Sequence, residues 1–158
     1  MNIRGAIFDL DGTLTDSMYI WQKAPVDLMR RYGGDPPEDL ARDLKEMGRR
    51  EAAEYLRSRF SLSTTPEELM DTLNDLVTEE YRSRVPMKPG ADRLLARLAD
   101  SAISCCIATA SEAFQARSAM ERLGLWPHFR FAVSCVQYGG KTRPDIYLEA
   151  ARRLGTVP

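Results

Sequence analysis

Residues 6–17 read AIFDLDGTLTDS, in which an apolar run stops at Asp9 and a second aspartate, Asp11, follows one residue later. A short apolar run without strict alternation is typical of a strand buried on both faces of a parallel sheet. Ligands of open α/β sheets bind beyond the carboxyl ends of the strands, so we expect Asp9 to face a crevice. If the backbone stays extended, Asp11 points to the same side and Leu10 turns into the core.

Two carboxylates held this close together must share a proton or a cation, because like charges raise each other's free energy. A hard divalent ion bound by oxygens, Mg²⁺ above all, relieves that repulsion. Gly12 then allows backbone to approach a ligand closely. The pair alone is weak evidence, since Asp-Gly is also a common turn. A calcium loop of the EF-hand type does not fit, because the twelfth position counted from Asp9 is Ile20 rather than glutamate.

Two further apolar runs, residues 103–108 and 131–133, predict strands that stop at Thr109 and Ser134. Helical patterns over residues 91–99 and 112–123 separate or precede these strands, and Gly124 is well placed to end the second helix. Alternation of strands and helices predicts an α/β fold with a Rossmann-like parallel sheet.

The middle of the chain, residues 17–85, has only helical patterns and reads as an inserted helical bundle. Thr65 followed by Pro66, with a glutamate three residues after the threonine, predicts a helix start. Pro25 must kink an earlier helix or begin it anew. Leu40, Leu44 and Met47 recur at helical spacing and predict another helix. The predicted domains are therefore a core of residues 1–16 plus 86–158 and an insert of residues 17–85.

Composition narrows the class of protein. The 158 residues are 44% hydrophobic and 28% charged, which favours a folded, soluble chain. A formal net charge of −1 provides no basic face, so nucleic acid is not an expected partner. The first residues form neither a signal peptide nor a membrane span, so no membrane partner is expected. The three cysteines lie in apolar runs and read as reduced, buried thiols, which favours a cytoplasmic location.

Three segments together resemble the haloacid dehalogenase superfamily. FDLDGTLTDS at 8–17 resembles its first motif, IATAS at 107–111 its second, and GGKTRPDIYLEAARRLG at 139–155 its third. The insert resembles the α-helical cap of that superfamily. The resemblance spans nearly the whole chain and has the motifs in the right order.

The resemblance implies a role for each matched residue. Asp9 would attack phosphorus and form an aspartyl-phosphate, and Asp11 would act as general acid and base. The Asp9 carboxylate and the Asp11 backbone carbonyl would hold Mg²⁺. The Thr109 hydroxyl, the Ala110 amide and the Lys141 ammonium would bind the phosphate oxygens.

The resemblance also predicts the substrate class, because an aspartate two residues after the nucleophile favours phosphate esters over halides and phosphonates. We expect a Mg²⁺-dependent phosphatase of a small phosphorylated metabolite. The alternatives are a sugar-phosphate mutase similar to β-phosphoglucomutase, and an inactive fragment or binding protein. Arg49 and Arg50 in the insert lie where related mutases place a substrate-contacting arginine, whose fork geometry suits a second phosphate.

One motif of the superfamily has no match here. Its fourth motif, an acidic pair after a further strand, has no counterpart after Lys141. We therefore expect weak Mg²⁺ binding, and a strand at residues 6–8 that becomes a sheet edge open to another chain. The chain as given would then have low stability, dimerise through this edge or belong to a longer product, whereas the full-length protein would be a monomer.

Overall fold

The computed structural model describes residues 3–156, and the chain divides into two compact units. One unit runs from residue 18 to residue 80, and the other contains residues 3–17 and 81–156. Residues 81–85 thus lie in the α/β unit, whereas the sequence prediction includes them in the insert. In α6 (Ala113–Arg122), Arg122 donates hydrogen bonds to the backbone carbonyls of Tyr81, at 3.2 Å, and of Val85, which joins these residues to the α/β unit.

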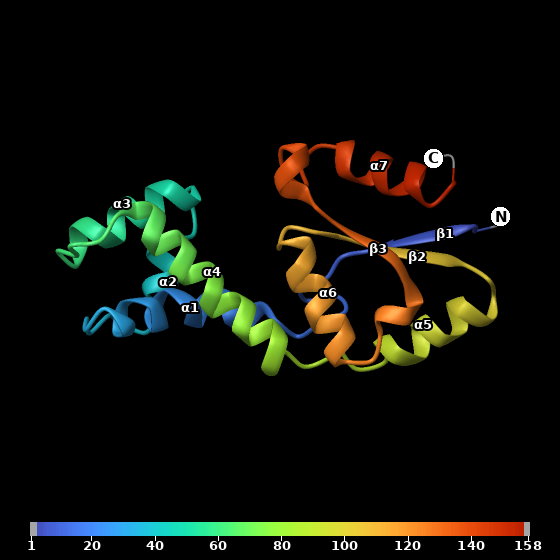
Figure 1. Ribbon diagram of the computed structural model, residues 1–158, viewed down its shortest axis with the longest axis horizontal. Helices are drawn as coiled ribbons and strands as arrows, with labels where there is room; N and C mark the ends of the chain where they lie inside the picture. Colours follow the sequence, from blue (N-terminus) through green and yellow to red (C-terminus); the bar gives the residue numbers. More distant parts are fainter. Residues whose placement is uncertain (1–2, 157–158) are drawn as a thin grey trace. The chain divides into compact units, whose positions relative to one another are not determined.

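The α/β unit is built on a parallel sheet in the order β1-β2-β3. Its strands are β1 (Gly5–Phe8), β2 (Ser104–Thr109) and β3 (Phe129–Ser134). Its helices are α5 (Ala91–Asp100), α6 (Ala113–Arg122) and α7 (Asp145–Arg153), with 3₁₀ turns η1 (Trp126–His128) and η2 (Cys135–Tyr138). Figure 1 shows α7 on one side of the sheet and α5 and α6 on the other. The predicted α/β fold is confirmed.

Local sequence explains where these elements stop. Gly124 adopts a positive φ of 72° directly after α6, and the next amide, that of Leu125, bonds back to the carbonyl of Met120 at 2.8 Å. This is the glycine stop that the sequence predicts for α6. Leu10 is fully buried, as expected from its place between the two aspartates.

The strands of the α/β unit share one core with α7. Cys106, Ala108, Val133, Cys135, Ile146 and Ala150 form a buried cluster. All three cysteines are buried and free of disulfides, as predicted. Because β1 and β2 pair from Gly5–Ser104 to Phe8–Ile107, residues after Phe8 leave the sheet beside the end of β2.

The unit of residues 18–80 is helical, as the sequence predicts. It contains α1 (Met18–Arg31), α2 (Leu40–Asp43) and α3 (Arg49–Arg59), and most of α4 (Pro66–Ser83). Its core is a separate cluster that includes Leu28, Met29, Leu40 and Leu56. Thr65 begins α4 as expected: its hydroxyl accepts from the Glu68 amide at 3.2 Å, and its own amide donates to the Glu68 carboxylate at 2.9 Å.

One detail of this unit differs from the sequence prediction. The helix expected over Leu40, Leu44 and Met47 ends at Asp43, and the Met47 amide bonds to the Leu44 carbonyl only three residues back. The spacing of apolar residues indicates which side of a segment faces the core. A series of turns can place apolar side chains on one side as a helix does, so the spacing alone does not determine where the helix ends. In α1, the helix passes through Pro25 and does not begin anew there. Within the described residues, no helix combines the length and apolar character needed to cross a membrane.

Candidate active site

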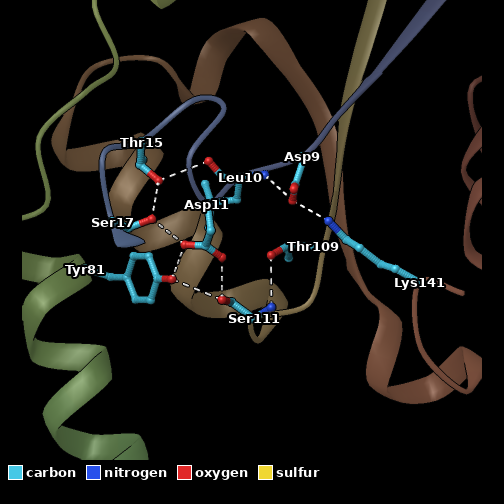
Figure 2. Close-up of polar contacts among 9 residues, drawn as sticks. All are labelled: Asp9, Leu10, Asp11, Thr15, Ser17, Tyr81, Thr109, Ser111 and Lys141. Atoms are coloured by element: carbon cyan, nitrogen blue, oxygen red, sulfur yellow. Dashed lines mark hydrogen bonds and ion pairs between the residues drawn. The ribbon is translucent and has the colours of Figure 1, made fainter. Parts of the chain in front are cut away.

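Asp9 lies directly beyond the end of β1, where an open α/β sheet places its ligand site. Its carboxylate oxygen Oδ1 accepts hydrogen bonds from the Leu10 amide at 2.7 Å and from the Lys141 ammonium (Figure 2). The Asp9 side chain is 44% exposed and that of Lys141 24%, so this ion pair lies at the surface of the unit. A partly exposed carboxylate beside an ammonium is accessible to a ligand that carries negative charge.

The loop after Asp9 is a tight turn rather than an extended strand. The Leu10 carbonyl accepts from the amides of Thr13, Leu14 and Thr15 at 2.9–3.2 Å. Gly12 has a φ of 77°, a left-handed conformation that glycine adopts without strain. The premise of an extended chain is therefore wrong. The Asp9 and Asp11 carboxylates have different hydrogen-bond partners.

The Asp11 carboxylate is bound by three hydroxyl groups. Ser17 donates to Oδ1 at 2.5 Å, the Tyr81 phenol donates to the same oxygen, and Ser111 donates to Oδ2 at 2.8 Å (Figure 2). Ser17 and Tyr81 are fully buried, and Ser111 is 3% exposed. The carboxylate thus has donors on both oxygens, from three separate stretches of chain.

Behind this set, Thr15 is also buried, with its hydroxyl 3.1 Å from the Leu10 carbonyl and 3.0 Å from the Ser17 hydroxyl. The structure describes no buried side-chain nitrogen or oxygen without a hydrogen-bond partner between residues 3 and 156. Because burying an unpaired polar group costs about 1–3 kcal/mol, a complete network of this kind holds its geometry tightly.

The phenol of Tyr81 stays protonated in this environment. Burial raises its pKa well above the ordinary tyrosine value, and the hydrogen bond to Asp11 raises it further. Its oxygen also lies 3.0 Å from the Ser111 hydroxyl. Each hydroxyl has one proton to donate, and when both groups donate to Asp11 no proton lies between the Tyr81 and Ser111 oxygens.

The second predicted motif lies at the end of β2. Thr109 is fully buried and its hydroxyl accepts from the Ser111 amide at 3.0 Å, while Ala110 between them is exposed. Thr109 pairs in register with Ser134, the last residue of β3, so it lies at the carboxyl edge of the sheet. Asp9, which follows β1, lies at the same edge. Ser111 therefore links this loop to Asp11.

The predicted site residues thus fall into two groups. Asp9, Asp11, Thr109 and Lys141 gather at the carboxyl edge of the sheet, with Ala110 on the same loop as Thr109. Arg49 and Arg50 lie exposed at the start of α3, in the helical unit, where the Arg50 guanidinium pairs with Glu54 at 3.1 Å and with Glu67 at 3.2 Å.

Few oxygens at this edge are arranged to hold a metal ion. Within residues 3–156, the structure contains no group of three histidine, cysteine, aspartate or glutamate side chains that could bind one. The Asp9 carboxylate and the Asp11 carbonyl are hard oxygen donors of the kind that suits Mg²⁺. This ion commonly binds through one or two carboxylates together with substrate phosphate and water. The two oxygen donors are therefore of the chemical type that Mg²⁺ binds.

Comparison with known proteins shows the family of this chain. The family model described as "Haloacid dehalogenase-like hydrolase" matches residues 6–158, so the chain belongs to this family of hydrolases. Among curated relatives, the chain is similar to a "Phosphorylated carbohydrates phosphatase" of Thermotoga maritima, at 26% identity over 99% of this chain and 73% of that protein. It is also similar to "Hexitol phosphatase A" of Escherichia coli, at 29% identity over all of this chain and 72% of that protein.

A solved structure shows the same fold. It is described as a putative β-phosphoglucomutase from Thermotoga maritima and has a TM-score of 0.84 at 26% identity, over 99% of this chain and 73% of that one. The resemblance to the phosphatase and β-phosphoglucomutase-like part of the superfamily is thereby confirmed.

Proposed function

We propose that this chain is a Mg²⁺-dependent phosphatase of a small phosphorylated sugar or polyol that works through an aspartyl-phosphate on Asp9. The observation that carries the proposal is the pairing of Asp9 with Lys141 beside Thr109, while Asp11 is held separately by hydroxyl groups. The named activities of the relatives, a phosphorylated-carbohydrate phosphatase and a hexitol phosphatase, support the substrate class.

In the proposed first step, an Asp9 oxygen forms a bond to phosphorus as the bond from phosphorus to the leaving oxygen breaks. The electron pair of that bond goes to the leaving oxygen, which takes a proton from Asp11. Water then attacks the phosphorus of the intermediate and gives a proton to Asp11, which frees phosphate and restores the Asp9 carboxylate. Each step leaves Asp11 ready for the other.

The phosphate would be held by Lys141, the Thr109 hydroxyl and the Ala110 amide, which provide positive charge and donors where negative charge gathers in the transition state. Mg²⁺, held by the Asp9 carboxylate and the Asp11 carbonyl, would supply charge neutralisation between the anionic nucleophile and the anionic substrate. Lys141 already neutralises part of the Asp9 charge without ligand.

The test is phosphate release from sugar phosphates and from p-nitrophenyl phosphate, with Mg²⁺ and with EDTA. We expect Mg²⁺-dependent release that Asp9→Asn abolishes. Asp100→Asn, the same chemical change at an exposed position at the end of α5, is the matched control and should retain activity. Activity that survives Asp9→Asn, or that EDTA does not reduce, would refute the proposal.

A mutase is the second candidate, because the solved structure at TM-score 0.84 is described as a putative β-phosphoglucomutase. It would return the phosphoryl group to a second hydroxyl of the sugar in place of water. A mutase would interconvert sugar monophosphates in the presence of a bisphosphate and release little phosphate. Measuring both products in one reaction separates the two candidates.

Arg49 and Arg50 are proposed to contact the substrate from the insert. An anionic substrate group would compete at Arg50 with the carboxylates of Glu54 and Glu67, which pair with its guanidinium. Arg49→Ala should raise the KM for a sugar bisphosphate and leave that for p-nitrophenyl phosphate unchanged. Arg57→Ala, farther along α3, is the matched control. No rise in the KM for the bisphosphate, or an equal fold-change in KM for both substrates relative to the wild type, would contradict this role.

A further inference from the structure

The Tyr81 phenol is a fully buried hydroxyl group that contacts Asp11, although 70 residues separate the two along the chain. Removing a tyrosine hydroxyl from water has a cost that a hydrogen bond must offset. Here the offset comes from a carboxylate, and hydrogen bonds to ionised acceptors are roughly twice as strong as neutral ones. Tyr81 is therefore placed to constrain Asp11 rather than only to fill the core.

The direction of this constraint follows from the two Asp11 oxygens. Tyr81 and Ser17 donate to Oδ1, and Ser111 donates to Oδ2 at 2.8 Å. A carboxylate bound on one oxygen can still rotate about its terminal bond, whereas donors on both oxygens fix that rotation. Ser17 lies on the same loop as Asp11, so it moves with it. Tyr81 and Ser111 come from other elements, α4 and the loop after β2, and tie the carboxylate to them.

We propose that Tyr81, with Ser111, is a positioning residue that holds the Asp11 carboxylate in the orientation for proton transfer. This inference rests on the proposed function, in which Asp11 is the general acid. Tyr81 itself touches no reacting atom; it acts through Asp11. The two hydroxyl oxygens lie 3.0 Å apart, and each donates its proton to the Asp11 carboxylate.

Leaving-group chemistry separates positioning from general damage. An alcohol is a strongly basic leaving group and needs a proton as its bond to phosphorus breaks, whereas p-nitrophenolate is weakly basic and leaves without one. General acid catalysis contributes about 10²–10⁴-fold, and a displacement of about 1 Å can cost about 10²-fold. A misoriented Asp11 should thus slow alkyl phosphates far more than p-nitrophenyl phosphate.

The first experiment measures kcat and KM of Tyr81→Phe with glycerol phosphate and with p-nitrophenyl phosphate. We expect kcat for glycerol phosphate to fall about tenfold to 10²-fold, kcat for the aryl ester to change less than about threefold, and both KM values to hold within about twofold. Tyr147→Phe, at a 40% exposed tyrosine of α7, is the matched control and should match the wild type. Equal losses with both substrates, or no loss, would overturn the inference.

A double-mutant cycle checks that Tyr81 acts through Asp11. In an Asp11→Asn background, Tyr81→Phe should have no further effect on the alkyl ester, because the group it positions is gone. Ser111→Ala should show the same selective loss as Tyr81→Phe. Additive losses from Tyr81→Phe and Asp11→Asn would show that Tyr81 acts elsewhere.

A second readout does not depend on turnover. A buried, hydrogen-bonded phenol proton exchanges slowly with water, so Tyr81 should give a hydroxyl proton resonance that Tyr81→Phe removes. Asp11→Ala should broaden or shift it strongly, while Asp9→Asn should leave it in place. A resonance unaffected by Asp11→Ala would refute the positioning role. Failure of the proposed function itself would give a different result, namely activity that survives Asp9→Asn.

Discussion

Lys141 and Asp9 form an ion pair at the end of the sheet, in which the ammonium offsets the charge of the carboxylate. In the proposed reaction, an arriving phosphate would meet a less negative surface than Asp9 alone would present. The same ammonium would then lie beside the phosphate oxygens, on which negative charge increases during transfer. At the scale of single residues, this lysine should matter for both binding and the chemical step.

Replacing Lys141 by methionine keeps most of the side-chain volume and removes the charge. We expect kcat/KM for phosphate esters to fall about 10²–10³-fold, the range seen when one transition-state donor is lost. Steady-state kinetics measures the change, and Lys45→Met, at an exposed lysine of the helical unit, is the control. A loss of less than about threefold would contradict a phosphate-binding role for Lys141.

Sequence alone could indicate some site residues and not others. Asp9, Thr109 and Lys141 follow strands or precede a helix in recognisable motifs, so their place at the carboxyl edge could be predicted. Tyr81 and Ser111 reach Asp11 only through the folded chain. Tyr81 continues the apolar stripe of α4 at four residues after Val77, so its pattern indicates burial and not a role in the site.

Thr65 illustrates how one side chain determines where an element begins. Its hydroxyl and amide both bond to Glu68 at the start of α4. Thr65→Ala removes the hydroxyl acceptor and should lower the free energy of unfolding by about 1 kcal/mol, measured by urea titration. Ser63→Ala, two residues earlier, is the control. No difference between the two variants would show that the cap contributes nothing to stability.

At the scale of single elements, strand β2 contains the Cys106 thiol, whose ionisation is linked to folding. Burial, followed by the neighbouring Cys105 thiol, raises the pKa of Cys106 to about 12. In the unfolded chain a cysteine ionises at about 8.5. Between these values the unfolded state has lost a proton that the folded state keeps, so stability is full at lower pH and falls as pH rises, by at most about 1.4 kcal/mol per pH unit.

Cys106→Ala and Cys106→Val should both flatten this alkaline decline, whatever each does to the stability at neutral pH. Urea unfolding under reducing conditions, followed by circular dichroism at several pH values above neutrality, measures the slope. If the wild type and both variants lose stability equally with pH, ionisation of Cys106 is not linked to unfolding.

Helix limits were harder to predict than helix positions, and α2 shows why. The apolar spacing correctly indicates that Leu40 and Leu44 face the bundle core, since Leu40 is buried and Leu44 packs against the same cluster. Whether the helix continues after Asp43 depends on the local backbone. A short helix loses backbone conformational entropy and gains few hydrogen bonds in return, so its end is difficult to predict.

On the scale of the whole molecule, two cores lie in two units of the chain. Leu56 belongs to the cluster of the helical unit and Ile146 to that of the α/β unit, and both are nearly or fully buried. Leu56→Ala and Ile146→Ala should each cost about 2–5 kcal/mol. The sequence predicts this division because its strand patterns stop before the insert and resume after it.

Native-state hydrogen exchange should locate each loss. Leu56→Ala should reduce protection in α1, α3 and α4 more than in β2, and Ile146→Ala should do the reverse. Equal loss of protection in both units from either substitution would mean that the two cores unfold as one cooperative body.

The central claim is that phosphorus becomes bonded to the Asp9 carboxylate. Acid quenching during turnover of p-nitrophenyl phosphate with Mg²⁺, followed by borohydride reduction, converts an acyl-phosphate into an alcohol that peptide mass spectrometry locates. We predict homoserine at position 9 in the wild type, and more of it in Asp11→Asn, which lacks the base that activates water. Reduction at another residue, or none at Asp9 while phosphate is released, would contradict the account.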